Sequence, residues 1–284
     1  MSKHHSIDIR DMADSDTDLD GALALSRAVN WPYRKDDWRV AVSLGRGVLA
    51  EADGRIVGSA LWWPYGDGLA TFGMIIVSPA MQGQGIGRML MDSLLRQAGD
   101  RTVLLNSTEE GLTLYRRYGF QTVGTVHQHQ AWTAADPAVN APVSSVRPFC
   151  PTDAAAIIDL DRGASGVDRK SLITRFMAIG DTVLCEADGT VAGFAICRRF
   201  GHGYAIGPMI GQSSQDAQSL IGYFLRAKAG EFLRVDIPGD SRLGEWLEGV
   251  GLPEVGRVTT MVRGARPQQT GPQRILALAS QSLG

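Results

Sequence analysis

The residues best suited to chemistry form a glycine-rich turn, Gln82-Gly83-Gln84-Gly85-Ile86-Gly87. An apolar segment, residues 73–77, precedes the turn, and a segment with apolar residues spaced by three and four follows it. Glycines let a backbone approach phosphate oxygens closely, and the first amides of a helix have no partner within the helix. A strand, such a turn and a helix N-terminus therefore predict a pyrophosphate-binding site.

Two familiar nucleotide-binding motifs do not fit this turn. A dinucleotide fingerprint needs the spacing G-x-G-x-x-G, which differs from the spacing here. A P-loop ends in Gly-Lys-Ser/Thr, whereas Arg88 follows Gly87. A glycine-rich helix start with no ligand remains the alternative when the turn is taken alone.

A second motif lies about thirty residues further on, Leu114-Tyr115-Arg116-Arg117-Tyr118-Gly119-Phe120. It resembles the L/F-Y-x-x-x-G-F motif of the GNAT acyltransferase superfamily, and Gln82–Gly87 resembles the Q/R-x-x-G-x-G/A signature of the same family. The two motifs occur in the family's order and spacing. The arrangement of residues 31–38 is also similar to a subgroup of two-domain bacterial GNAT proteins.

The resemblance implies that acetyl-CoA is the cofactor and that no metal takes part. It implies that the turn binds the pyrophosphate, that the preceding strand pairs with the pantetheine arm, and that Tyr115 gives a proton to the departing thiolate. A packed aromatic with a solvated hydroxyl is the alternative role of Tyr115. The cofactor-binding residues expected from the resemblance are Ile75, Ile76, Val77, Gln82, Gly83, Gln84, Gly85, Ile86, Gly87, Arg88 and, at the end of the next strand, Asn106.

The acceptor side is less defined by the sequence. Trp31, Tyr33 and Trp38 lie where the family often forms its acceptor pocket, and core packing is equally compatible with their types. Arg234 and Asp236 share one face of a strand; Asp236 is a candidate substrate residue, with a surface ion pair as the favoured alternative. The general base is not identified. Four carboxylates near the expected acceptor site are candidates, although each is more typical of a solvated side chain: Asp36, Asp67, Glu109 and Glu110.

The chain repeats itself. Residues 48–61 and 183–196 are identical at eight of fourteen positions at an offset of 135, and each copy reads as a hairpin with an Ala-Asp-Gly turn. Weaker echoes relate residues 119–126 to 251–258, and Arg10 to Arg147. The order of β and α signals predicts an α/β (α+β) fold: two tandem GNAT-like domains, each a mixed, mostly antiparallel sheet flanked by helices.

The expected partition is a catalytic, acetyl-CoA-binding domain at 1–132, a linker at 133–145, a divergent domain at 146–265 and a tail at 266–284. The second domain lacks the glycines of the turn, has Asp216 where pyrophosphate would lie, and has Leu247 in place of Tyr115. We therefore expect only the first domain to bind acetyl-CoA. The tail contains a short apolar segment, residues 275–283, which suits either a strand or a helix.

The overall charge and composition argue against some classes of binding partner. A net charge of −2 argues against nucleic acid and anionic membranes, which need a basic face. Three cysteines and the lack of a signal-like or membrane-spanning apolar run point to a reducing cytoplasm. His127 and His129 share a strand face, but no third ligand lies near them in sequence to complete a metal site.

The leading hypothesis is an N-acetyltransferase acting on the amine of a small molecule by direct attack in a ternary complex. A protein acetyltransferase, a non-catalytic acyl-CoA-binding regulator and the use of a longer acyl-CoA remain open. The oligomeric state is not predicted.

Overall fold

The computed structural model describes residues 6–137, 145–187 and 189–284, so most of the expected linker, residues 138–144, lies outside the described residues. The first half contains β1 (Ile7–Asp11), α1 (Asp16–Ala28), α2 (Lys35–Leu44), β2 (Arg46–Ala52), β3 (Arg55–Tyr65), β4 (Leu69–Val77), α3 (Ile86–Ala98), β5 (Thr102–Ser107), α4 (Leu112–Arg117) and β6 (Gln121–Trp132). The second half contains β7 (Ser145–Pro148), α5 (Ala154–Ser165), α6 (Lys170–Ile179), β8 (Gly180–Ala187), β9 (Thr190–Phe200), β10 (Gly203–Gly211), α7 (Ser214–Ala227), β11 (Phe232–Pro238), α8 (Gly244–Gly249), β12 (Glu254–Arg263) and β13 (Arg274–Ala277).

The predicted duplication is confirmed, because the two halves have the same order of elements up to β12. The first repeated segment forms the hairpin β2–β3, whose turn residues Asp53 and Gly54 have φ angles of 50° and 71°. The weak echo at Arg10 and Arg147 also has a structural cause. Each arginine bridges two carboxylates of its own half, Asp18 and Glu51 for Arg10, and Asp153 and Glu186 for Arg147.

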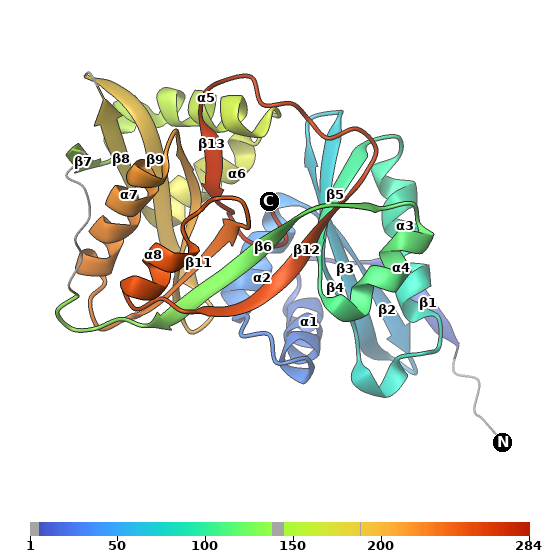
Figure 1. Cartoon of the computed structure of the whole chain (residues 1–284). Helices are drawn as coiled ribbons and strands as arrows, with labels where there is room; N and C mark the ends of the chain where they lie inside the picture. Colours follow the sequence, from blue (N-terminus) through green and yellow to red (C-terminus); the bar gives the residue numbers. More distant parts are fainter. Residues whose placement is uncertain (1–5, 138–144, 188) are drawn as a thin grey trace.

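The halves exchange their last strands. In the described part of the chain, the strands follow one another as β1-β2-β3-β4-β5-β12-β6-β11-β10-β9-β8-β7, with β13 paired to β10. Thus β12 of the second half lies beside β5, and β6 of the first half lies beside β11. Figure 1 shows β6 and β12 running side by side across the middle of the molecule. A cut at residue 132 therefore assigns β6 to a domain whose sheet it joins only through β12.

Helices cover both faces of the sheet and bury three clusters of apolar side chains. One cluster lies in the first half and includes Phe72 and Leu90, together with Met261 from the exchanged strand β12. Another belongs to the second half and includes Phe224. The third joins the halves, because Trp38 from α2 packs in the same cluster as Phe176 from α6. This shared core and the exchanged strands make the two halves one structural unit. None of the helices that the structure describes combines the length and the apolar character needed to cross a membrane.

The tail folds back into the molecule. Its apolar segment begins as the strand β13, which pairs antiparallel with β10, and continues through residues 278–284, which include a turn, toward the first half. The Tyr65 hydroxyl donates a hydrogen bond of 2.6 Å to the carbonyl oxygen of Leu283, and Arg169 donates one of 2.8 Å to that of Gly284. The tail therefore contacts both halves where they meet.

Candidate active site

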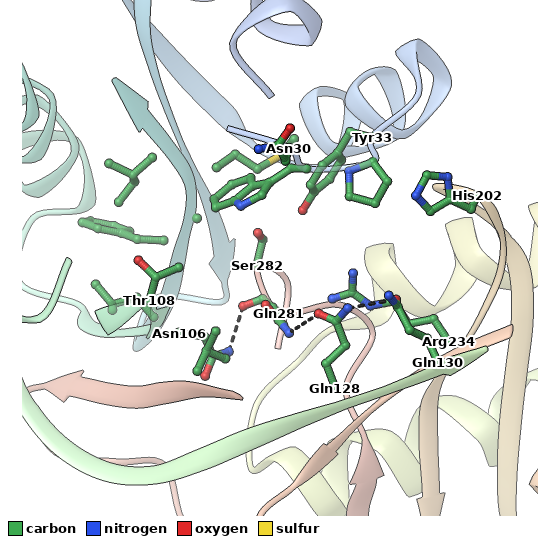
Figure 2. Close-up of a pocket in the computed structure, with 18 of the residues that line it drawn as sticks. Asn30, Tyr33, Asn106, Thr108, Gln128, Gln130, His202, Arg234, Gln281 and Ser282 are labelled. Atoms are coloured by element: carbon green, nitrogen blue, oxygen red, sulfur yellow. Dashed lines mark hydrogen bonds between the residues drawn. The ribbon is translucent and has the colours of Figure 1, made fainter. Parts of the chain in front are cut away.

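The site begins where two parallel strands of the first half diverge. Strands β4 and β5 pair from Leu69–Phe72 to Thr102–Leu105, and beyond these residues they no longer pair. A cavity of about 280 Å³ lies at this point. It is lined by both strands, by the segment between α1 and α2, and by residues of the second half and the tail: Asn30, Trp31, Pro32, Tyr33, Phe72, Gly73, Met74, Ile75, Leu105, Asn106, Thr108, Tyr115, Gln128, Gln130, His202, Arg234, Val258, Gln281 and Ser282. Figure 2 shows the labelled polar side chains converging on this space.

A β-bulge in β4 shapes the edge that faces the cavity. The register between β3 and β4 shifts between Ser59 and Leu61, and Met74 has a φ of 52°, an unusual value for a residue other than glycine. The Ser59 hydroxyl donates a buried hydrogen bond of 2.9 Å to the Met74 carbonyl oxygen, which holds the bulge in place. Backbone distortion of this kind is frequent next to active sites, where it redirects main-chain groups.

The glycine-rich turn joins β4 to α3 with exposed amides. Gly83 and Gly85 have φ angles of 78° and 83°, and a Cβ atom at either position would have no neighbour within 4 Å. The amides of Arg88 and Met89 both bond to the Gly85 carbonyl oxygen, so the amides before them precede the helical hydrogen-bond ladder. The turn therefore presents glycine backbone and a helix N-terminus to solvent, as a bound anion requires.

Tyr115 lies in the cavity wall. Its side chain is 8% exposed and its ring packs edge-on against Phe120 at 6.1 Å between centroids. Burial raises the pKa of Tyr115 to about 12, so its hydroxyl keeps its proton near neutral pH. The helix α4 is held against α3, because the Tyr118 hydroxyl donates to Asp92 at 2.7 Å.

The other expected cofactor residues differ in their surroundings. Ile75 lines the cavity, whereas the Ile76 side chain is 3% exposed and packs into the core shared by the two halves. Val77 lies next to the turn, since a Cβ atom at Gly87 would be 3.9 Å from it. Asn106 lines the cavity, but its amide already accepts from Thr260 and donates to the Gln281 carbonyl oxygen, at 2.7 and 2.8 Å.

On the acceptor side, Trp31 and Tyr33 line the cavity, while Trp38 is fully buried and belongs to the core. Arg234 and Asp236 do form an ion pair, but the expectation of a surface pair was wrong. The exposed fractions of their side chains are 11% and 6%, because β6 and the tail cover them. The four carboxylates considered as general bases, Asp36, Asp67, Glu109 and Glu110, are exposed and do not line the cavity.

Several lining residues were not singled out from the sequence. Gln128 and Gln130 lie on β6 and alternate with the histidines His127 and His129, whose side chains point to the other face. The pattern Gln-x-Gln on a strand does not by itself indicate a binding site. These glutamines reach the cavity because β6 lies between β12 and β11. Among the residues that the structure describes, no three His, Cys, Asp or Glu side chains gather as a metal site requires.

The second half has the corresponding groove, but the protein fills it. Strands β10 and β11 pair over Tyr204–Ile206 and then diverge, and β13 pairs with β10 over Met209–Gly211. At the start of α7, the Asp216 carboxylate accepts hydrogen bonds from the amides of Gln212 and Ser213, at 2.8 and 2.9 Å. The groove is thus occupied by a strand of this chain, and the amides that precede the helix are satisfied by its own side chain.

The tail completes the wall of the cavity in the first half. Gln281 donates to Gln128 through its side-chain amide at 3.2 Å (Figure 2). The same amide donates to Asp236 at 3.1 Å. Ser282 lies against β4, where a Cβ atom at Gly73 would come within 2.5 Å of the Ser282 Cβ. Position 73 therefore needs glycine for the tail to reach the cavity.

This contact gives a testable prediction. We expect Gly73→Ala to lower the free energy of unfolding by about 1–3 kcal/mol, because the added methyl overlaps the tail. Denaturant titration measures the loss, and hydrogen exchange should show faster exchange in residues 278–284. Adding Ser282→Gly should restore part of the stability, since it removes the nearest side-chain atoms. Unchanged exchange in the tail of Gly73→Ala would contradict this account of the contact.

Comparisons with known proteins agree with this geometry. Two matches to families described as "Acetyltransferase (GNAT) domain" cover residues 43–122 and 157–276, and together they span more than half of the chain. The chain belongs to the GNAT acetyltransferase family. The second match shows that the divergent half is also a GNAT domain, as the internal repeat predicted.

Individual relatives are distant but cover most of the chain. An uncharacterised N-acetyltransferase of Bacillus subtilis, YitH, is 28% identical over 78% of this chain and 79% of its own length. A holothin acyltransferase of a Pseudoalteromonas species is 27% identical over 78% of this chain and 75% of its own length. The crystal structure of a putative acetyltransferase from Pyrococcus horikoshii has the same fold, with a TM-score of 0.80 over both full chains at 19% identity.

Proposed function

We propose that this GNAT protein transfers an acetyl group from acetyl-CoA to the amine of a small molecule, in the cavity between its two halves. The observation that carries the proposal is the continuity of the site. The unpaired edge of β4 and the Tyr115 side chain line the groove left where β4 and β5 diverge, and β4 leads along the chain to the exposed glycines of the turn. The groove opens into a cavity whose far wall comes from the second half and the tail.

The residues of the groove suit acetyl-CoA, the cofactor that GNAT domains use. Amides of residues 83–87 and the Arg88 guanidinium would hold the pyrophosphate, and the edge of β4 would pair with the pantetheine arm. Acetyl-CoA supplies the acetyl group as an activated thioester. Main-chain amides at the bulge near Met74 are suited to stabilise negative charge on the carbonyl oxygen.

Tyr115 would act as the general acid. The amine nitrogen forms its bond to the carbonyl carbon while the carbon–sulfur bond breaks, and Tyr115 gives its proton to the sulfur. The amine gives up a proton to solvent, and Tyr115 regains one from solvent, so the protonation of the protein is unchanged after a turnover. A hydroxyl with a pKa of about 12 is fully protonated at neutral pH and is therefore competent as a donor.

Only the first half is proposed to bind acetyl-CoA. In the second half β13 takes the place beside β10, and Asp216 places a carboxylate on the amides at the start of α7. A pyrophosphate there would have to displace a hydrogen-bonded anion of the protein. The second half instead contributes Arg234 and His202 to the acceptor side of the first site.

A small acceptor is favoured over a protein because the second half and the tail enclose the cavity on the side away from the turn. The holothin acyltransferase among the relatives is named for a small-molecule acceptor, which supports the same choice.

Calorimetric titration with acetyl-CoA, followed by a thiol-release assay with a panel of amines, tests the proposal. We expect one molecule bound per chain and release of free CoA with at least one small amine. Two molecules bound per chain would contradict the inactive second half, and no binding would contradict acetyl transfer altogether. Acetylation of peptides but of no small amine would favour a protein acceptor.

A further inference from the structure

The charges around the acceptor side of the cavity are unbalanced. Among the described residues that line the cavity there is no Asp or Glu, and the charged side chain that lines it is Arg234. The remaining polar lining consists of amides and hydroxyls, including Asn30, Gln130 and Ser282, together with His202. A cationic acceptor would find no carboxylate on this wall.

The guanidinium of Arg234 is held by hydrogen bonds along one edge, and its other edge still has N–H donors without a partner among the described residues. Its Nε and Nη2 atoms bond to the Asp236 carboxylate at 3.0 Å, and Gln281 donates to the same carboxylate at 3.1 Å. No hydrogen bond from Nη1 occurs among the residues that the structure describes, and the side chain is one of those facing the cavity. A guanidinium bonded along one edge leaves its other edge, with Nη1 and the second proton of Nη2, free to act as a bidentate donor to a carboxylate.

Two ion pairs and the guanidinium of Arg198 lie behind this wall. The charges of Arg234, Asp236 and Asp37 act on Tyr33, and those of Asp37, Arg234 and Arg34 act on Arg198. Asp37 is paired with Arg34, and Asp236 with Arg234.

Arg198 is the cation without a carboxylate partner among the described residues. It is 4% exposed and lies between the rings of Phe176 and Phe200, with centroids 4.3 and 4.8 Å from its guanidinium carbon. It donates to the Ala279 carbonyl oxygen of the tail, and its Nε has no hydrogen-bond partner. Burial lowers the pKa of Arg198 to about 10, so the group remains charged at neutral pH.

We infer that the acceptor is an amine that also carries a carboxylate, and that Arg234 binds this carboxylate at the far wall of the cavity. The inference rests on the proposed acetyl transfer and adds the class of acceptor to it. Arg234 provides the directional contact, and the buried Arg198, which lies beside Tyr33 and Ser282 of the cavity wall, adds a second positive charge nearby. With the carboxylate on Arg234, the amine end extends across the cavity toward the residues of β4 and Tyr115 that also line it. Figure 2 shows Arg234 on one side of this space and Asn106 and Thr108 on the other.

Small ω-amino acids are the probes. Glycine, 3-aminopropanoate, 4-aminobutanoate and 5-aminopentanoate are compared with their primary amides and with diamines of equal length. Binding to the CoA-loaded protein is measured by calorimetry, and acetylation by thiol release. We expect at least one acid to bind about 10- to 100-fold more tightly than its amide, as loss of a charge-assisted hydrogen bond implies, and the diamine to bind more weakly still.

A charge-neutral double variant isolates the contact. Arg234→Gln with Asp236→Asn removes the pair without leaving an uncompensated charge, and the carbonyl oxygen of the new amide can still accept from Gln281. The preference for the acid over its amide should disappear, while the affinity for acetyl-CoA stays unchanged. Arg199→Gln is the matched control, since it removes an exposed arginine that stacks on Tyr204 outside the cavity.

The outcomes separate this inference from the proposed function. If no acid binds better than its amide, or the diamines bind best, the inference is wrong, whatever is acetylated. If the preference survives in the double variant, Arg234 is not the anchor. If the protein does not bind acetyl-CoA at all, the proposed function itself fails.

Discussion

We expect the Gly85→Glu variant to lose at least 100-fold in affinity for acetyl-CoA, as measured by calorimetry. Gly85 is the N-cap of α3 and has a φ of 83°, where a side chain has no neighbouring atoms and extends into the space above the turn. Glutamate would place a carboxylate at the helix N-terminus, where it competes with the pyrophosphate for the same amides. A loss of about 2.7 kcal/mol of binding free energy corresponds to 100-fold.

Backbone strain must be separated from this effect. A residue other than glycine at positive φ costs about 1–2 kcal/mol, so the variant should also be less stable. Gly251→Glu is a suitable control, because Gly251 follows α8 in the second half with a φ of 86° and is exposed without neighbours within 4 Å. The amides of Gly251 and Leu252 bond back to α8 as they do at a left-handed helix end, so Gly251→Glu should lose similar stability but retain acetyl-CoA binding. Equal affinity of the two variants would show that the turn is not the pyrophosphate site.

Local sequence signals predicted the elements that carry the candidate cofactor site of the first half. The glycines of the turn, the strand before it and Tyr115 are close in sequence to the elements that position them, so the strand and helices that the motifs predict are those of the structure. The repeat at 48–61 and 183–196 predicted the hairpins because a two-residue turn and its flanking strands are encoded within fourteen residues.

The acceptor wall was harder to predict, because it depends on contacts between distant residues. The echo between 119–126 and 251–258 marks β6 and β12 as equivalent strands, but it does not say with which half each one pairs. Gln128 reaches the cavity only because β6 lies between β12 and β11. Arg234 and Asp236 read as a surface pair because their alternation is compatible with any half-buried strand.

The structure of the tail likewise depends on contacts with residues that are distant in sequence. Its apolar segment suits either a strand or a helix when read alone, and the choice is made by the unpaired edge of β10. The glycine at position 73 is explained only by Ser282, more than two hundred residues away. The loss of the glycines in the second half, by contrast, could be seen in the sequence. In the structure, Asp216 caps α7 at the place where a pyrophosphate would bind in an intact turn.

We expect the Tyr115→Phe variant to lower kcat by about 100- to 10,000-fold with little change in the KM for acetyl-CoA, as removal of a general acid implies. The phenyl ring retains the packing against Phe120, so only the hydroxyl is lost. Steady-state thiol release with the best acceptor measures both parameters. Tyr118→Phe is the control. Tyr118 belongs to the same motif as Tyr115, but its hydroxyl donates to Asp92 of α3 and its side chain does not line the cavity.

The pH dependence tests whether Tyr115 keeps its proton throughout the assay range. Because burial raises the pKa of Tyr115 to about 12, its proton is present throughout the range in which the protein can be assayed. The rate of the wild type should therefore not fall between about pH 7 and 10 through ionisation of this group. The Tyr115→Phe variant should be slower by the same factor across that range. A deficit that shrinks toward alkaline pH would mean that Tyr115 loses its proton within this range, against the raised pKa, whereas a kcat of the variant within about threefold of the wild type would mean that another group protonates the thiolate.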